Sequence, residues 1–262
     1  MSAISRFLAI IVVLASCISG CLAEEIQLTG NEARAPKVFL DGGKPSGILV
    51  DITHYIEKEL KLTFNIQLYP FNRAYRDAVD GKSGIIGLSR TSDRLPLFDY
   101  GDEPMFYDDV VLVVEKGKEF PFSTIEDLRG KKLGIPRGAS FGDEFDKAVK
   151  EGIFTTEGGA HPTQQLAMLS AGRLDAVLVG VGKQGLVEAL RNKEATSLIR
   201  PGTEFTVLPK PFARDPNYMA FAKTANRSEL LHQVDKVLRK GYATGAIPAI
   251  IDKYSEKAGT GK

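Results

Sequence analysis

The segment Gly87-Leu88-Ser89-Arg90-Thr91-Ser92-Asp93-Arg94 carries residue types suited to holding an anion. It follows the apolar pair Ile85-Ile86, which is typical of the end of a buried strand. A glycine there lets a ligand approach the backbone, and an arginine further along can present two parallel N–H donors to a carboxylate. We therefore predict a carboxylate site at Gly87, Ser89 and Arg94. The competing interpretation is that Arg94 only caps a surface turn.

A second motif, Gly138-Ala139-Ser140-Phe141-Gly142, follows another strand-like run. Its G-x-S-x-G pattern is that of a hydrolase nucleophile turn, but the histidine that a triad needs could only be His161 or His232. His232 lies in a segment with the periodicity of an amphipathic helix, which disfavours it as a base. Free N–H groups at a helix that starts near Ser140 would instead form an anion site, and this predicts a second contact at Gly138 and Ser140.

No cofactor or metal is predicted. Gly180-Val181-Gly182-Lys183-Gln184-Gly185 matches the G-x-G-x-x-G dinucleotide fingerprint, but Pro201-Gly202 interrupts the approach to the acidic Glu204 and no further βαβ set follows. The three histidines are scattered singly, without acidic or cysteine partners at ligand spacing, so we expect no metal site.

The order of these segments resembles the bacterial extracellular solute-binding proteins that supply polar amino acids to ABC importers. In that family a G-x-[ST]-x-T-x-x-R segment clamps the ligand carboxylate, and Gly87, Ser89 and Arg94 fall on its positions. Gly138 and Ser140 match the turn that the family uses on the other side of the ligand. The resemblance covers the chain from about residue 26 to residue 254.

Two positions depart from the family pattern. Arg34 stands where the resemblance implies an aromatic residue that stacks on the ligand, and Gly180 stands where it implies an acidic partner for an α-ammonium group. A buried ammonium without a partner is costly, so Glu32 or Asp108 would have to replace the missing acid. These departures favour an anionic ligand, as do the basic residues expected near the cleft, which are Arg34, Lys37, Arg73, Arg90, Arg94 and Arg137.

The segment Phe71-Asn72-Arg73-Ala74 resembles a P-[FW]-x-R-A stretch of one branch of the family. Phe71 could stack on a ligand. Arg73 at a helix start is poorly placed for the helix dipole, so we list it as a candidate ligand contact. A half-buried phenylalanine with a solvated arginine is the alternative.

Strand-like and helix-like patterns alternate along the chain, which predicts an α/β protein. The resemblance implies the two-lobe type II periplasmic-binding-protein fold with two crossing hinge strands. Polar, turn-forming residues after the apolar run Val110–Val114, and the pair Pro201-Gly202, mark the crossings. We expect residues 24–114 and 204–262 in the first lobe and residues 115–203 in the second.

Residues 1–23 read as a secretory signal peptide. The apolar run Phe7–Ala15 is shorter than the roughly 20 residues of a membrane span. Cleavage after Ala23 and lipidation of Cys21 remain alternatives, and both place the mature protein in the periplasm, in the second case membrane-anchored. The two cysteines, Cys17 and Cys21, lie in this leader, so no disulfide is expected in the folded part.

The charge balance of the chain gives no electrostatic attraction to a nucleic acid or an anionic membrane surface. The chain has 34 basic and 33 acidic residues, and loss of a leader whose only charge is Arg6 leaves equal numbers. We therefore expect no nucleic-acid binding. The resemblance implies a monomeric binding protein that captures a small carboxylate or amino acid and presents its closed form to a membrane permease. A sensor that docks on a receptor and a dehydratase-like enzyme on the same scaffold are the alternatives.

Overall fold

The computed structural model describes residues 25–191 and 196–259. The predicted signal peptide, and with it Cys21 and Ala23, lies outside these residues. None of the helices in the described part of the chain combines the length and the apolar character that crossing a membrane requires.

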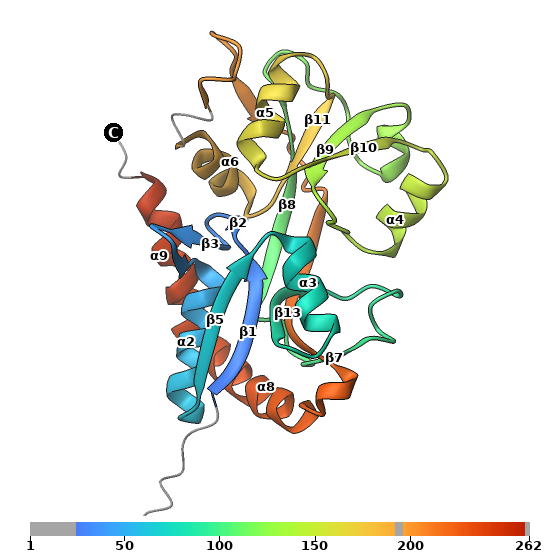
Figure 1. Cartoon of the computed structure of the whole chain (residues 1–262). Helices are drawn as coiled ribbons and strands as arrows, with labels where there is room; N and C mark the ends of the chain where they lie inside the picture. The colour runs from blue at the N-terminus through green and yellow to red at the C-terminus, as the bar shows by residue number, and fades with distance from the viewer. Residues whose placement is uncertain (1–24, 192–195, 260–262) are drawn as a thin grey trace, which may run out of the picture.

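The described chain folds into two α/β lobes that two long strands connect (Figure 1). This confirms the predicted fold class. The main sheet has the strand order β10-β9-β11-β8-β13-β6-β1-β5, with β12 added beside β8 and β7 beside β13. A small sheet, β2-β3-β4, forms a separate hairpin unit near the junction of the lobes.

The first lobe holds both ends of the described chain. Its strands and helices are β1 (Glu25–Asn31), β2 (Ala33–Arg34), β3 (Val38–Asp41), β4 (Lys44–Ser46), α2 (Ile48–Leu60), β5 (Thr63–Tyr69), α3 (Phe71–Val79), β6 (Gly84–Ser89), β7 (Phe98–Tyr100), α8 (Ser228–Ala243) and α9 (Ala246–Gly259), with a short 3-10 turn at Lys223–Ala225.

The second lobe is inserted between the two connecting strands. These strands are β8 (Phe106–Glu115) and β13 (Ala213–Ala222). Between them come a 3-10 turn (Ile125–Leu128), β9 (Lys132–Pro136), α4 (Asp143–Lys150), β10 (Thr155–Gly159), α5 (Pro162–Ser170), β11 (Ala176–Val179), α6 (Gly182–Arg191) and β12 (Phe205–Val207).

Strand β8 belongs to both lobes. Its first half pairs with β13, from Phe106 opposite Asn217 to Val110 opposite Ala213, and its second half pairs with β11 and β12. The lobe boundaries after residues 114 and 203 stay predictions. The strand pairing favours crossings near Val110 and Ala213.

The second half of β8 is buried on both faces. Leu112 packs with Phe145 of α4, whereas Val113 packs with Leu166 of α5 on the other side of the sheet. Successive side chains of a strand point to opposite faces, so a continuous apolar run is what a strand covered by helices on both sides requires.

The β2–β4 hairpin is held against the start of α2. The amides of Ile48 and Leu49 donate to the carbonyl oxygens of Pro36 and Lys37, at 3.0 and 2.9 Å. These helix amides have no partner inside the helix, so the hairpin satisfies them. Gly47 precedes them with a φ of 115°, and a Cβ there would lie 2.6 Å from the Lys37 carbonyl oxygen.

Glycines shape the bounds of two helices. Helix α4 begins at Asp143 rather than near Ser140, because Gly142, with a φ of 102°, forms its N-cap in a conformation that continues no helix. Helix α8 continues through Gly241, a residue that disfavours helices, and the missing side chain there makes room for Ile247 and Tyr55.

We predict that Gly47→Ala destabilises the fold more than Gly43→Ala does. Both glycines have positive φ, but a Cβ at Gly43 meets nothing within 4 Å. The control should cost about 1 kcal/mol of unfolding free energy, and Gly47→Ala about 1–3 kcal/mol more, since backbone must also move. Urea denaturation measures both; equal losses would contradict the packing of the hairpin against α2.

Candidate functional site

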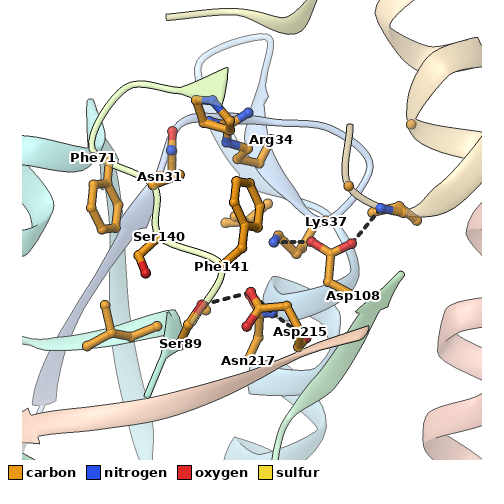
Figure 2. Close-up of a pocket in the computed structure, with 18 of the residues that line it drawn as sticks. Asn31, Arg34, Lys37, Phe71, Ser89, Asp108, Ser140, Phe141, Asp215 and Asn217 are labelled. Atoms are coloured by element: carbon orange, nitrogen blue, oxygen red, sulfur yellow. Dashed lines mark hydrogen bonds and ion pairs between the residues drawn. The ribbon is translucent and has the colours of Figure 1, made fainter. Parts of the chain in front are cut away.

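A cavity of about 90 Å³ lies between the lobes, and Figure 2 shows its surroundings. The hairpin, β6, β8 and β13 line it from the first lobe and the connecting strands. The turns after β9 and β11 line it from the second lobe. Its ionisable lining residues are Arg34, Lys37, Arg94, Asp108, Arg137 and Asp215.

Arg94 is a buried cation in the wall of this cavity. It is only 9% exposed, and the turn that carries it is closed by a hydrogen bond from its amide to the Thr91 carbonyl oxygen, at 3.0 Å. Its Nη1 donates to the Ser89 carbonyl oxygen at 3.1 Å, and its Cζ lies 5.7 Å from the centre of the Phe71 ring. Within the described residues the guanidinium has this single hydrogen-bond partner, which leaves donors for a ligand.

Gly87 and Ser89 sit where the sequence placed them, at the end of β6 in the cavity wall. Gly87 has a φ of 79°, and a Cβ would lie 2.6 Å from Leu49 Cδ1, so a glycine is required. Ser89 lies opposite Asn217 in the β6–β13 pairing. Its Oγ donates to Asp215 Oδ2 at 2.7 Å, a contact drawn in Figure 2.

Asp215 is an acidic cavity residue that the sequence analysis did not identify. Asn217 Nδ2 donates to its carboxylate at 3.3 Å, while Asn217 Oδ1 is buried without a partner among the described residues. Burial raises the pKa of Asp215, and the nearby Lys37 ammonium partly opposes this. The cavity thus contains a carboxylate that a ligand cation could neutralise.

Asp108 fills the space beside Gly180. A Cβ at Gly180 would lie 2.6 Å from Asp108 Oδ2 and 2.9 Å from Oδ1. The buried carboxylate forms an ion pair with Lys37 and accepts the amide of Val181 at 2.5 Å (Figure 2). Asp108 of β8 therefore occupies the space next to Gly180, where the family pattern implies an acidic residue after β11. Its carboxylate is already paired with Lys37.

Arg34 is a second arginine of the cavity lining, and like Arg94 it has no ion-pair partner among the described residues. Desolvation lowers its pKa to about 10, and the charge of Asp108 limits this decrease. The guanidinium is still protonated at neutral pH, yet the structure shows it no hydrogen bond or ion pair with the described residues. An anionic group of a ligand would offset its desolvation.

The second lobe contributes the turn after β9. Ser140 lines the cavity, but its Oγ donates to Asp146 Oδ2 at 2.6 Å and accepts the Gly142 amide at 3.2 Å. The first turn of α4 carries Asp143, Glu144 and Asp146, which disfavours the anion site that we predicted at this helix start. The same bonds and the exposure of His232 on α8 give no support to a catalytic triad.

Gly138 lies at the contact between the lobes rather than in the cavity lining. A Cβ there would lie 2.7 Å from Asn72 Oδ1 and 3.2 Å from Phe71 Cδ1. Ser92 of the first lobe also donates to Asp143 of the second, from its amide at 3.1 Å and its Oγ at 2.5 Å. The lobes are therefore in contact around the cavity.

Besides Gly138, two further predicted site residues lie outside the binding cavity. Arg73 is exposed on α3, with its Cζ 3.6 Å from the centre of the Tyr69 ring and its Nε 3.8 Å from Asp77. Glu32 lines a neighbouring cavity. Phe71 lines both cavities, and the structure adds Lys37, Asp215, Asn217 and Phe141 to the binding cavity. Among the described residues, no three His, Cys, Asp or Glu side chains gather closely enough to hold a metal ion.

The comparison with known proteins identifies the family. The bacterial extracellular solute-binding proteins, family 3, match residues 26–257. The chain belongs to this family. It is therefore an extracellular solute-binding protein, and the resemblance inferred from the Gly87–Arg94 segment is confirmed.

Individual relatives are distant. The L-cystine-binding protein TcyJ of Escherichia coli K12 is 22% identical over 232 residues, which cover 87% of this chain and 81% of TcyJ. A solved histidine kinase sensor domain with similarity to periplasmic binding proteins has a TM-score of 0.73 at 21% identity, covering 88% of this chain and 96% of its own. An ancestral arginine-binding protein bound to arginine has a TM-score of 0.70 at 24% identity, covering 88% and 97%.

We predict that Asp215→Asn stabilises the protein at neutral pH. Because burial raises the pKa of Asp215, the folded state keeps this proton to higher pH than the unfolded state, so stability falls as pH rises from about 3.9 through the raised pKa. The melting temperature of the variant should exceed that of the wild type at pH 7, and the gap should close below about pH 3.9.

Asp93→Asn is the matched control, because Asp93 is exposed and lies outside the cavity lining. It should leave the melting temperature nearly unchanged at both pH values. A stabilisation by Asp215→Asn that is the same at low and neutral pH would contradict the assignment of the effect to the buried charge.

Proposed function

We propose that this protein captures a small carboxylate, amino-acid-like in its head group, between its lobes and delivers it to an ABC importer. The observation that carries the proposal is Arg94, a buried guanidinium with hydrogen-bond donors left over at the cavity wall. A carboxylate is the partner whose geometry matches a guanidinium. Gly87 gives the ligand access to the backbone beside it.

Asp215 supports an amino group next to that carboxylate. It lies in the same cavity as Arg94, held by Ser89 and Asn217, and its carboxylate carries no cationic partner within ion-pair distance in the described residues. A ligand ammonium there would offset the desolvation that raises the pKa of Asp215. In this proposal Asp215 replaces the acid missing at Gly180, rather than Glu32 or the already paired Asp108.

The charge of the lining favours anionic solutes. Asp108 and Lys37 neutralise each other, which leaves Arg34, Arg94 and Arg137 against Asp215. The relatives named above bind L-cystine and arginine, and we include both compounds among the candidates. The excess of cations supports an acidic amino acid or another dicarboxylate over a basic amino acid.

The proposal extends to the cellular role. The mature protein would act as a monomer in the periplasm, free or lipidated at Cys21, and the permease would recognise the closed form that the ligand stabilises. The protein would bind its solute without chemical conversion. A sensor that docks on a receptor stays the alternative prediction, as does a dehydratase-like enzyme.

We predict that Arg94→Ala abolishes ligand binding while Arg73→Ala preserves it. Arg94 contributes a desolvated charge-assisted pair, whose loss costs about 2–5 kcal/mol of binding free energy. Arg73 is an exposed arginine of the same lobe that lies outside the binding cavity. Isothermal titration calorimetry measures both variants, and unchanged affinity of Arg94→Ala would contradict the carboxylate assignment.

We also predict the order of solutes in a thermal-shift screen. A ligand at a hundredfold excess over its dissociation constant adds about 2.7 kcal/mol of stability. Glutamate and other dicarboxylates should raise the melting temperature more than arginine or lysine does, because three arginines line the cavity besides the Lys37–Asp108 pair, against the one further carboxylate of Asp215. A larger shift with arginine would overturn the preference for anions.

A further inference from the structure

Two carboxylates face each other across the connecting strands. Asp108 of β8 lies opposite Asp215 of β13 in the antiparallel pairing, and both line the binding cavity (Figure 2). Like charges directly opposite each other on neighbouring strands repel. Burial raises the pKa of Asp215, and the charge of Asp108 adds to that rise. A cation close to both groups is therefore needed to keep both ionised.

Lys37 supplies that cation. Its ammonium forms an ion pair with Asp108, and the two side chains are only 14% and 3% exposed. The same ammonium opposes the rise that burial causes in the pKa of Asp215. One lysine of the protein thus serves two acidic residues of the cavity wall, where a solute would place its own cationic groups.

The position of Lys37 is fixed from both sides. Its carbonyl oxygen accepts the Leu49 amide at the start of α2, at 2.9 Å. Its ion-pair partner Asp108 also accepts the amide of Val181, in the turn between β11 and α6, at 2.5 Å. The ion pair therefore connects the hairpin of the first lobe to a turn of the second lobe, and Lys37 is part of the cavity wall.

We propose that Lys37 determines the charge of the solute that this protein selects, because it occupies the place of a second ammonium group beside Asp108 and Asp215. This inference rests on the proposed function, in which Asp215 receives the single amino group of the solute. A second cationic group on a solute meets the Lys37 ammonium and an Asp108 that is already neutralised. Without Lys37 both carboxylates are available, and the same cavity suits a diamino acid such as lysine.

The probes are L-glutamate, L-glutamine and L-lysine, whose side chains are negative, neutral and positive. Isothermal titration calorimetry on the mature protein measures each affinity. Lys37→Met should move the ratio of glutamate to lysine affinity at least about tenfold toward lysine. Asp108→Asn should move the same ratio at least about tenfold toward glutamate, because it leaves the Lys37 ammonium without its partner. Glutamine is the reference where a charged solute binds too weakly to measure.

The two single variants break the same ion pair, which separates selectivity from structural damage. Damage to the site alone would lower all three affinities without moving their ratio in opposite directions. The double variant Lys37→Met/Asp108→Asn removes both charges and leaves no buried charge of the pair behind. Its ratio should lie within about threefold of the wild-type ratio. Melting temperatures establish that each variant folds, and if Lys37→Met does not fold, Asp108→Asn and the double variant decide the question.

Lys44→Met is the matched control, because Lys44 is an exposed lysine of the same hairpin outside the cavity lining. It should keep the wild-type ratio. A ratio that is unchanged in a folded single variant, or that moves the same way in both, would overturn the role of Lys37 while the proposed function stands. If none of these proteins binds any of the three solutes, the inference is overturned, and if no other small carboxylate binds, the proposed function is overturned with it.

Discussion

The buried carboxylate of Asp108 is the contact on which the arrangement of the site depends. It joins three parts of the chain: β8, the hairpin through Lys37, and the turn before α6 through the Val181 amide. Val181 itself adopts a φ of 59°, an unfavourable conformation for a β-branched residue, so the surrounding contacts must hold it there. Loss of one partner would leave a desolvated charge, which is why such groups are costly to disturb.

This arrangement sets the charge of the cavity. With Asp108 occupied by Lys37, the remaining acidic group is Asp215, and the remaining cations are arginines. The cavity lining therefore has more cations than anions without an ion-pair partner among the described residues. Closing the lobes costs free energy unless a solute brings complementary charge, and that dependence couples binding to the shape of the protein.

The parts of the site that the sequence could reveal are local. Gly87, Ser89 and Arg94 lie within one short segment, so their spacing alone brings them together. The antiparallel pairing of β13 with β6 brings Asp215 and Asn217 to the cavity. The residues near Asp215 in the sequence do not indicate that it will accept a hydrogen bond from Ser89, which lies far away along the chain. A cation is unfavourable at a helix start, which makes Arg73 a candidate from the sequence, but its guanidinium lies over the Tyr69 ring at the surface.

The same distinction applies to the fold. Apolar runs such as Val110–Val114 predicted their strands, whereas Thr155–Gly159, with two glycines and little apolar content, is a strand only because it pairs with β9. The start of α4 was missed because Gly142 interrupts a segment of otherwise helical composition.

Gly138 affects how closely the two lobes approach each other, but it does not affect which solute the cavity prefers. At this position backbone of the second lobe rests against the side chains of Phe71 and Asn72, and a methyl group there would have to displace them. A side chain there would act as a wedge that holds the lobes apart, without changing any charge that the solute meets. Affinity for every solute would fall together while their ranking stayed the same. Overall binding strength and selectivity therefore reside in different residues and can change independently.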